Sequence, residues 1–208
     1  VFTLLPILGL VVKNRTHNSR VVSNIKQPSV AVVIPAYRAG RYLLDTVDAV
    51  YNTKAIHQRN IIVVCDKCSA SIMKKVKSRG VQMLNVNFKE STKVKALQHA
   101  LPFISSSVDA VVILDSDNVV ALDFFDKILA AFQSGFQIVQ GRRVAKNRAS
   151  SLAALDGVSE IYNNFIFREM RVRLGLSSAL IGSGFIMAKD LYDRVIPKLK
   201  AVGGFDKE

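Results

Sequence analysis

Cysteine, histidine and tryptophan are scarce in this sequence. It contains two cysteines, three histidines and no tryptophan among 208 residues. Cys65 and Cys68 form a Cys-x-x-Cys pair, but a zinc site needs further ligands at suitable spacing, and the histidines are dispersed. A redox pair usually opens a helix, whereas Cys65 follows the apolar run 61–64. We therefore interpret both residues as ordinary thiols in a reducing compartment.

Acidic residues are scarce relative to basic ones. The 29 Lys and Arg exceed the 16 Asp and Glu, so the net charge is +13. Such a charge attracts phosphates, nucleic acid or an anionic membrane surface. The basic residues are scattered and accompany no nucleic-acid-binding motif, so we predict a nucleotide and a membrane as partners, and no nucleic acid. The hydrophobic content of 50% excludes a disordered chain and suits one domain of ordinary size.

The beginning of the sequence has no complete bilayer-spanning run. Residues 1–12 are apolar and uncharged, but a spanning helix needs about twenty residues. No basic start and no small-residue cleavage site mark a secretory signal. Because no initiator Met is present, we interpret 1–12 as the truncated end of a transmembrane helix and 13–28 as a basic linker on the cytoplasmic side. A buried or disordered segment is the alternative for residues 1–12.

Residues 29–208 alternate apolar strands with amphipathic helices. This order predicts one domain of α/β class, with a mostly parallel sheet covered by helices on both faces. The expected strands are 30–34, 61–64, 81–86, 110–114 and 136–140, and a glycine-broken turn runs into another strand within 181–187. The expected helices are 41–52, 71–79, 92–103, 123–134, 150–174 and 190–200.

Two carboxylates stand where the apolar run 110–114 ends. Asp115 and Asp117, separated by Ser116, follow this run directly and therefore belong at the carboxyl edge of the sheet. Hard cations such as Mg²⁺ and Mn²⁺ prefer carboxylate oxygens and share their shell with substrate phosphates. The pattern favours a metal and diphosphate site, while a helix cap or a solvated turn is the alternative.

Polar residues follow other strands at the same edge. The loop 35–38 comes after the first strand, and Asp66 comes after the second. Convergence of separate loops at one rim is typical of a nucleotide pocket. We predict that Asp66 accepts the imide hydrogen of a uracil and that Tyr37 packs on the base. Helix capping for Asp66 and core packing for Tyr37 are the alternatives.

An ordered set of motifs carries a resemblance over residues 30–208. The motifs are Val33–Tyr37, the Asp66 loop, Lys93–Ala100, Asp115–Asp117, Gln140–Arg143, Gly182–Gly184 and Gly203–Asp206. With these motifs in this order, the chain resembles family 2 glycosyltransferases, which are inverting, metal-dependent enzymes with a GT-A fold, a Rossmann-like nucleotide-binding sheet. It looks closest to the membrane-bound branch that includes cellulose, chitin and hyaluronan synthases.

The resemblance implies roles for the nucleotide-binding and metal-binding positions. Asp66 would recognise the uracil, Asp115 would lie near the ribose and donor sugar, and Asp117 would bind Mg²⁺ or Mn²⁺. Lys95 would lie beside the phosphates as a point charge, although Val94 and Gln98 depart from the family pattern. A solvated helix face is the alternative for Lys95. The remaining implied nucleotide contacts are Pro35, Ala36, Tyr37 and Ser116.

The resemblance also implies contacts to the sugar and the acceptor. Gly182, Ser183 and Gly184 resemble the turn against the donor sugar, where glycine lets the backbone approach a ligand. Gln140 and Arg142 would be substrate contacts. The alternatives are a plain turn for the glycines and solvated side chains after a strand. The catalytic base would be an acid near the end of the sequence, either Glu208 or a residue beyond it.

The expected function follows from these roles. The resemblance implies transfer of a hexose or N-acetylhexosamine from a UDP-sugar to a glycan or lipid-linked acceptor, by a membrane protein whose catalytic domain is cytoplasmic and incomplete at its C-terminus. A nucleotidyltransferase is one alternative, but the loop 35–40 lacks the glycine run typical of that class. A homologue that binds the nucleotide sugar without turnover is the other alternative.

Overall fold

The computed structural model describes residues 27–144 and 151–204. These residues form two compact units, one within Arg142–Ile181 and the other within Asn24–Gly141 and Gly182–Glu208. The predicted anchor 1–12 and most of the linker 13–28 lie outside the described residues. No helix among the described residues combines the length and hydropathy that a bilayer crossing requires.

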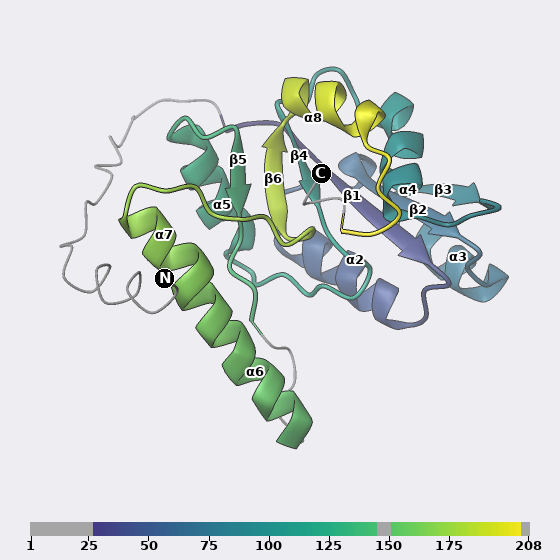
Figure 1. Ribbon diagram of the computed structural model, residues 1–208. Coiled ribbons are helices and arrows are strands. Elements are labelled where there is room, and N and C mark those ends of the chain that lie inside the picture. The colour runs from purple at the N-terminus through teal and green to yellow at the C-terminus, as the bar shows by residue number, and fades with distance from the viewer. Residues whose placement is uncertain (1–26, 145–150, 205–208) are drawn as a thin grey trace. The chain divides into compact units, whose positions relative to one another are not determined.

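A six-stranded sheet forms the centre of the larger unit (Figure 1). Its order is β3-β2-β1-β4-β6-β5. β1, β2, β3 and β4 run parallel, whereas β6 is antiparallel to both of its neighbours. The predicted α/β class with a mostly parallel sheet is therefore confirmed. The strands are β1 (Val30–Tyr37), β2 (Ile61–Asp66), β3 (Gln82–Val86), β4 (Ala110–Ile113), β5 (Ile138–Gln140) and β6 (Phe185–Ala188).

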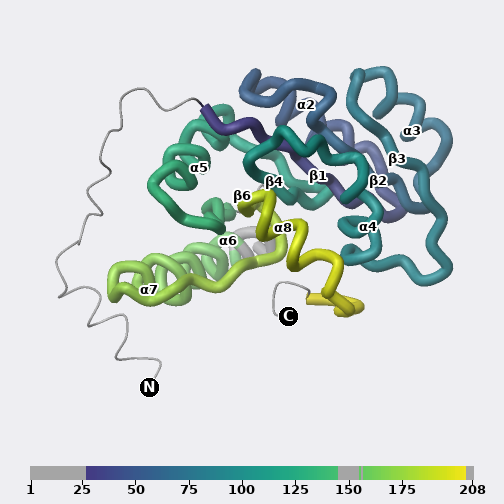
Figure 2. The backbone as a smooth tube through the Cα atoms, turned by 90° about the horizontal axis from the view of Figure 1, so that it is seen from above, coloured from purple at the N-terminus to yellow at the C-terminus, as the bar shows by residue number. Residues whose placement is uncertain are grey.

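Helices cover both faces of this sheet, as Figure 2 shows. α2 (Tyr42–Asn52), α3 (Ala70–Lys77) and α5 (Phe124–Gln133) share one hydrophobic core with alternate residues of β1 and β2. α4 (Lys93–Ala100) and α8 (Lys189–Val195) cover the other face. The central strands are buried on both sides, which explains why their sequences are continuous apolar runs. Short 3₁₀ segments lie at Gln58–Asn60, Leu101–Phe103 and Ile196–Lys198.

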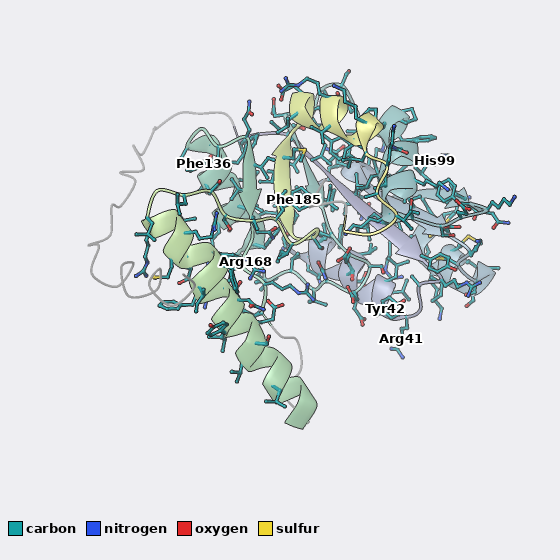
Figure 3. The ribbon with its side chains drawn as sticks, in the orientation of Figure 1. Arg41, Tyr42, His99, Phe136, Arg168 and Phe185 are labelled. Atoms are coloured by element: carbon teal, nitrogen blue, oxygen red, sulfur yellow. The ribbon has the colours of Figure 1, made fainter. Side chains whose placement is uncertain are left out.

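The antiparallel direction of β6 is the feature of the sheet that the alternating pattern did not predict. β6 lies between β4 and β5 (Figure 1). Its first residue, Phe185, which Figure 3 labels, pairs with Ile113 on one side and with Gln140 on the other. Because β6 runs in the opposite direction, the turn that precedes it lies at the carboxyl end of β4. This reversal brings Gly182–Gly184 to the same edge as Asp115.

The smaller unit contains the segment predicted as one helix over 150–174. The structure has α6 (Ser151–Asn163), a π-helical turn (Asn164–Glu169) and α7 (Met170–Arg173) in succession. Asn164 Nδ2 donates to Arg143 O at 2.6 Å, and Arg168 Nη1 donates to Asn164 Oδ1. Gly175, at φ 75°, follows the end of α7 and adopts the left-handed conformation that often terminates helices.

Candidate active site at the carboxyl edge of the sheet

Five strand ends bring the predicted site residues to one edge of the sheet. Tyr37 and Asp66 are paired in register at the ends of β1 and β2. Asp115 follows the end of β4, Gln140 ends β5, and Gly184 precedes β6. The pairing of Phe185 with both Ile113 and Gln140 places these last three segments side by side. The edge thus collects residues that are far apart in the sequence.

The loop after β4 is held by hydrogen bonds from several elements. Asp115 N donates to Ser183 Oγ at 2.7 Å, and Ser183 Oγ itself donates to Asn118 Oδ1. From α2, the buried Thr46 donates its hydroxyl to Ser116 O at 2.9 Å. These contacts hold the backbone at Asp115 and Ser116 in place.

Lys93, and not the predicted Lys95, is the lysine that contacts the Asp115 loop. Lys93 Nζ donates to Asp115 Oδ1 and, at 2.6 Å, to Gly182 O, so one ammonium links the β4 loop to the glycine turn. Lys95 Nζ instead donates to Glu90 O at 2.9 Å and lies 3.6 Å from Glu90 Oε2. The two lysines stand on different sides of α4 because two residues span about 200° of a helix.

Asp117 presents an exposed carboxylate beside this braced loop. Its Oδ1 accepts a hydrogen bond from Asn118 Nδ2 at 3.1 Å. Among the residues described, no group of three or more His, Cys, Asp or Glu is arranged to hold a metal ion. Two aspartates suit Mg²⁺ or Mn²⁺, since these ions bind through one or two carboxylates and take their other ligands from water and substrate phosphates. The donor set therefore fits a hard cation that arrives with a diphosphate.

The ends of β1 and β2 present different chemistry. Asp66 is buried, at 3% exposure, and its Oδ1 accepts from Phe88 N at 3.2 Å. Tyr37 is half exposed, with Arg38 Cζ 5.2 Å and Lys67 Nζ 5.8 Å from the centre of its ring. A carboxylate beside an accessible aromatic ring suits a nucleobase, through one hydrogen bond and one stacking surface.

Two residues in left-handed backbone conformation shape this part of the edge. Arg38 has φ 46° and Lys67 has φ 55°, values that are uncommon outside glycine. Arg38 N donates to Asp66 O at 2.9 Å, which joins the two turns. Such conformations persist where the surrounding structure imposes them, and they are frequent at ligand sites.

The glycine turn packs against the end of β5. Gly141 N donates to Gly184 O at 2.8 Å, and Gln140 Nε2 donates to Ser183 O at 2.9 Å. A Cβ at Gly141 would lie 2.7 Å from Gly184 O and 2.8 Å from the ring of Phe124. Gly182 and Gly184 have φ 73° and 70°, so the turn depends on glycine at both positions.

Several predicted residues have other surroundings. Pro35 and Ala36 lie within β1, and Ala36 is buried, so it offers the site only its backbone. Gln140 uses its side-chain amide to hold the glycine turn, since Nε2 donates to Ser183 O. Arg142 belongs to the smaller unit, where its Nη1 lies 3.6 Å from Glu169 Oε1. Glu208 lies outside the described residues.

Sequence reasoning missed the residues that brace the site. Thr46 lies on a helix with an apolar pattern, and no local motif links it to Ser116. The roles of Asn118 and Lys93 arise from contacts with the Gly182–Gly184 turn. One signal was available for Lys93, because it is the first residue of α4 after the N-cap Thr92 and therefore belongs to the end of the helix nearest the strand ends.

Solved structures share this fold at low sequence identity. A mannosyltransferase from Pyrobaculum calidifontis in complex with GDP-Man and Mn²⁺ matches with a TM-score of 0.66 and 16% identity, over 93% of this chain and 55% of that one. Glucosyl-3-phosphoglycerate synthase from Mycobacterium tuberculosis with UDP matches with a TM-score of 0.53 and 18% identity, over 79% of this chain and 58% of that one. Further structures of the mycobacterial enzyme hold UDP with Mn²⁺ or with Mg²⁺.

The chain therefore has the fold of these GT-A glycosyltransferases and spans just over half the length of each. A comparison with curated proteins found no match. Among protein families, the one described as "Glycosyltransferase like family 2" matches residues 28–208. With its Asp66, Asp115–Asp117 and Gly182–Gly184 segments on one edge of a GT-A sheet, the chain belongs to glycosyltransferase family 2.

Proposed function

We propose that this protein is an inverting, metal-dependent glycosyltransferase that moves a hexose or N-acetylhexosamine from a UDP-sugar to a glycan or lipid-linked acceptor. The observation that supports this most is the braced Asp115 loop. It presents one exposed carboxylate, Asp117, next to an Asp115–Lys93 pair on the edge where the base-binding residues also lie. Membership of family 2 supports the reaction class.

Two groups of residues at this edge bind different parts of the donor. Asp66 and Tyr37 hold the uracil, by a hydrogen bond to the imide and by ring stacking. Asp115 approaches the ribose and the donor sugar, and the Lys93 ammonium attracts the negative diphosphate. The Gly182–Gly184 turn has no large side chain, so the sugar and the acceptor end approach its backbone closely.

Asp117, with Asp115, is the residue that would hold Mg²⁺ or Mn²⁺. When bound, the cation neutralises charge on the departing diphosphate. The acceptor hydroxyl oxygen forms a bond to the anomeric carbon while the bond from that carbon to the phosphate oxygen breaks. The proton of the hydroxyl passes to an acidic residue, for which Glu208 or a later residue is our proposal. One displacement inverts the configuration of the anomeric carbon.

The test is replacement of Asp117 in the full-length protein. We expect Asp117→Asn to lower Mn²⁺-dependent UDP release by about 100-fold or more, because the amide carries no charge for the cation. Asp126→Asn, an exposed change on α5, is the matched control. Full activity in a folded Asp117→Asn protein would disprove the metal role. Tight UDP binding without turnover in the unmodified protein would identify the non-catalytic homologue instead.

We also propose that the protein works at a membrane with its catalytic domain on the cytoplasmic side, in the manner of the membrane-bound synthase branch, with 1–12 as part of a spanning helix, 13–28 as a linker and 29–208 as the catalytic domain. One side of α6 supports a membrane partner. Leu155, Val158, Ile161 and Tyr162 recur at helical spacing and are 50% to 65% exposed. Apolar residues on one face of a helix, in a strongly basic protein, suit an anionic bilayer surface.

Vesicle binding tests this second proposal. We expect the protein to sediment with vesicles of anionic phospholipid, and Ile161→Asn to weaken that binding. Ser159→Asn, on the same helix and also exposed, is the matched control. Equal sedimentation of both variants would show that this side of α6 does not contact the membrane.

A further inference from the structure

We propose that Cys65 and Cys68 form a reversible disulfide that weakens nucleotide binding, so that this pair is an oxidative modification site beneath the base-binding part of the edge. Formation of the disulfide stands on the placement of the two thiols, and it replaces the interpretation of both residues as ordinary thiols that their sequence positions favoured. Its effect on the nucleotide rests on the function proposed above. The chain has only these two cysteines, so an intramolecular disulfide joins no other pair.

The two cysteines lie close together where β2 ends. Cys65 is fully buried in β2, and Cys68 is partly exposed one residue before Ser69, the N-cap of α3. Cys68 Sγ donates to Ala36 O at 3.4 Å, and Ala36 is the partner of Cys65 in the register of β1 with β2. Cys65 belongs to the hydrophobic core, and Cys68 packs against that same core. A strand end followed by a turn therefore holds the two thiols in one small region.

The environment makes Cys68 the more reactive member of the pair. A hydrogen bond from Cys65 lowers the pKa of Cys68 to about 7, and the backbone N–H of Ala39 acts in the same direction. Burial and the nearby Asp66 carboxylate oppose this shift. The pKa of Cys65 is raised, mainly because a hydrogen bond to Cys68 stabilises its thiol form and also because it is buried. Near neutral pH, Cys68 supplies the thiolate and Cys65 the second thiol.

Oxidation by a small disulfide, such as oxidised glutathione, proceeds in two balanced steps. The Cys68 thiolate attacks one sulfur of the oxidant and forms a mixed disulfide with it, while the other half of the oxidant leaves as a thiolate and takes up a proton. Cys65 then loses its proton and attacks Cys68 Sγ, so that the second half of the oxidant leaves. Two protein thiols have become one disulfide, and the oxidant has become two thiols.

The disulfide encloses residues of the site. Asp66 and Lys67 are the two residues between the cysteines, and Lys67 stands in the left-handed turn at φ 55°. Moving Cys68 Sγ into a bond with Cys65 removes its contact with Ala36 O on the neighbouring strand. The turn that aims Asp66 and Lys67 then changes, whereas the braced loop at Asp115 has no direct link to the pair in the contacts described. The expected effect is on nucleotide affinity.

The experiment uses the whole protein before and after treatment with oxidised glutathione. We expect the intact mass to fall by the mass of two hydrogen atoms. We also expect peptide mapping to find a disulfide that joins Cys65 to Cys68. Calorimetry with UDP should show affinity lower by about tenfold, the loss that accompanies one misplaced hydrogen bond to a charged group. Treatment with dithiothreitol should restore it. Cys68→Ser and Cys65→Ala proteins should keep their UDP affinity in the presence of the oxidant.

The outcomes separate this proposal from the proposed function. A stable mixed disulfide on Cys68, or a dimer on a non-reducing gel, without the internal disulfide would overturn the modification site. An internal disulfide with unchanged UDP affinity would overturn the effect on binding. A reduced protein that does not bind UDP would contradict the proposed function, while the mass measurement would still decide whether the disulfide forms.

Discussion

The end of β4 and the ends of β1 and β2 belong to one edge of the sheet, yet the chain holds them differently. The loop at Asp115 is braced from α2, α4 and the Gly182–Gly184 turn. The turns at Arg38 and Lys67 are short, left-handed and joined mainly by backbone bonds, and they present accessible side chains. The region that we propose for the diphosphate is therefore held by side-chain hydrogen bonds from other elements, whereas the region that we propose for the base is shaped by its local backbone conformation.

This comparison predicts that substitutions at the braced region cost more stability than those at the β1 and β2 turns. The largest loss is expected for Gly141→Ala, because the new Cβ would meet Gly184 O and the Phe124 ring. We expect a fall of about 3 kcal/mol in the free energy of unfolding, measured by urea denaturation. Gly40→Ala is the control, since its Cβ would meet only the exposed side chain of Tyr42. Equal stability of the two variants would show that the turn adapts.

The next effect is expected for Lys93→Met. This change removes the ammonium that joins Asp115 to Gly182 O, and because both charged side chains are partly exposed we expect a loss of about 2 kcal/mol or less. Lys95→Met removes only an exposed pair with Glu90 and should cost less than about 0.5 kcal/mol. UDP affinity should fall in the first variant and not in the second. A larger fall in UDP affinity for Lys95→Met than for Lys93→Met would indicate that Lys95 is the lysine beside the nucleotide.

A smaller effect is expected for Thr46→Val. The valine fills the same space but leaves Ser116 O without its donor from α2, which should cost about 1 kcal/mol in the free energy of unfolding. Thr46→Ser keeps the hydroxyl and should recover most of this loss. If serine and valine behaved alike, the hydroxyl would not be what holds the loop.

The smallest effect is expected for Arg38→Gly. Arg38 has a left-handed backbone conformation that glycine adopts without strain, so the change stabilises the folded state by about 1 kcal/mol. Glycine also increases the conformational entropy of the unfolded chain, which destabilises the folded state by about the same amount. We expect the free energy of unfolding to change by less than about 0.5 kcal/mol, while UDP binding weakens because Arg38 no longer lies over Tyr37. A large loss of stability would show that substitutions at the β1 and β2 turns cost as much as substitutions at the braced Asp115 loop.

The sequence by itself determined the elements and their order. Apolar runs buried on both faces predict central strands, and β1, β2 and β4 lie within a few residues of the expected positions. Asp66 ends β2, and Asp115 and Asp117 come just after β4, so their arrival at one edge is a consequence of parallel pairing. Periodicity also predicted the long helix over 150–174, but not its π-helical turn, which places Asn164 against Arg143 O.

Only the tertiary structure decided the direction of β6 and the identity of the residues that brace the site. Strand direction depends on which neighbours complete the sheet, and a four-residue apolar strand carries no mark of it. Reversal of β6 brings Ser183 to Asp115, and the pitch of α4 selects Lys93 over Lys95. These contacts join residues tens of positions apart, so their geometry is set by packing and not by any local pattern in the chain.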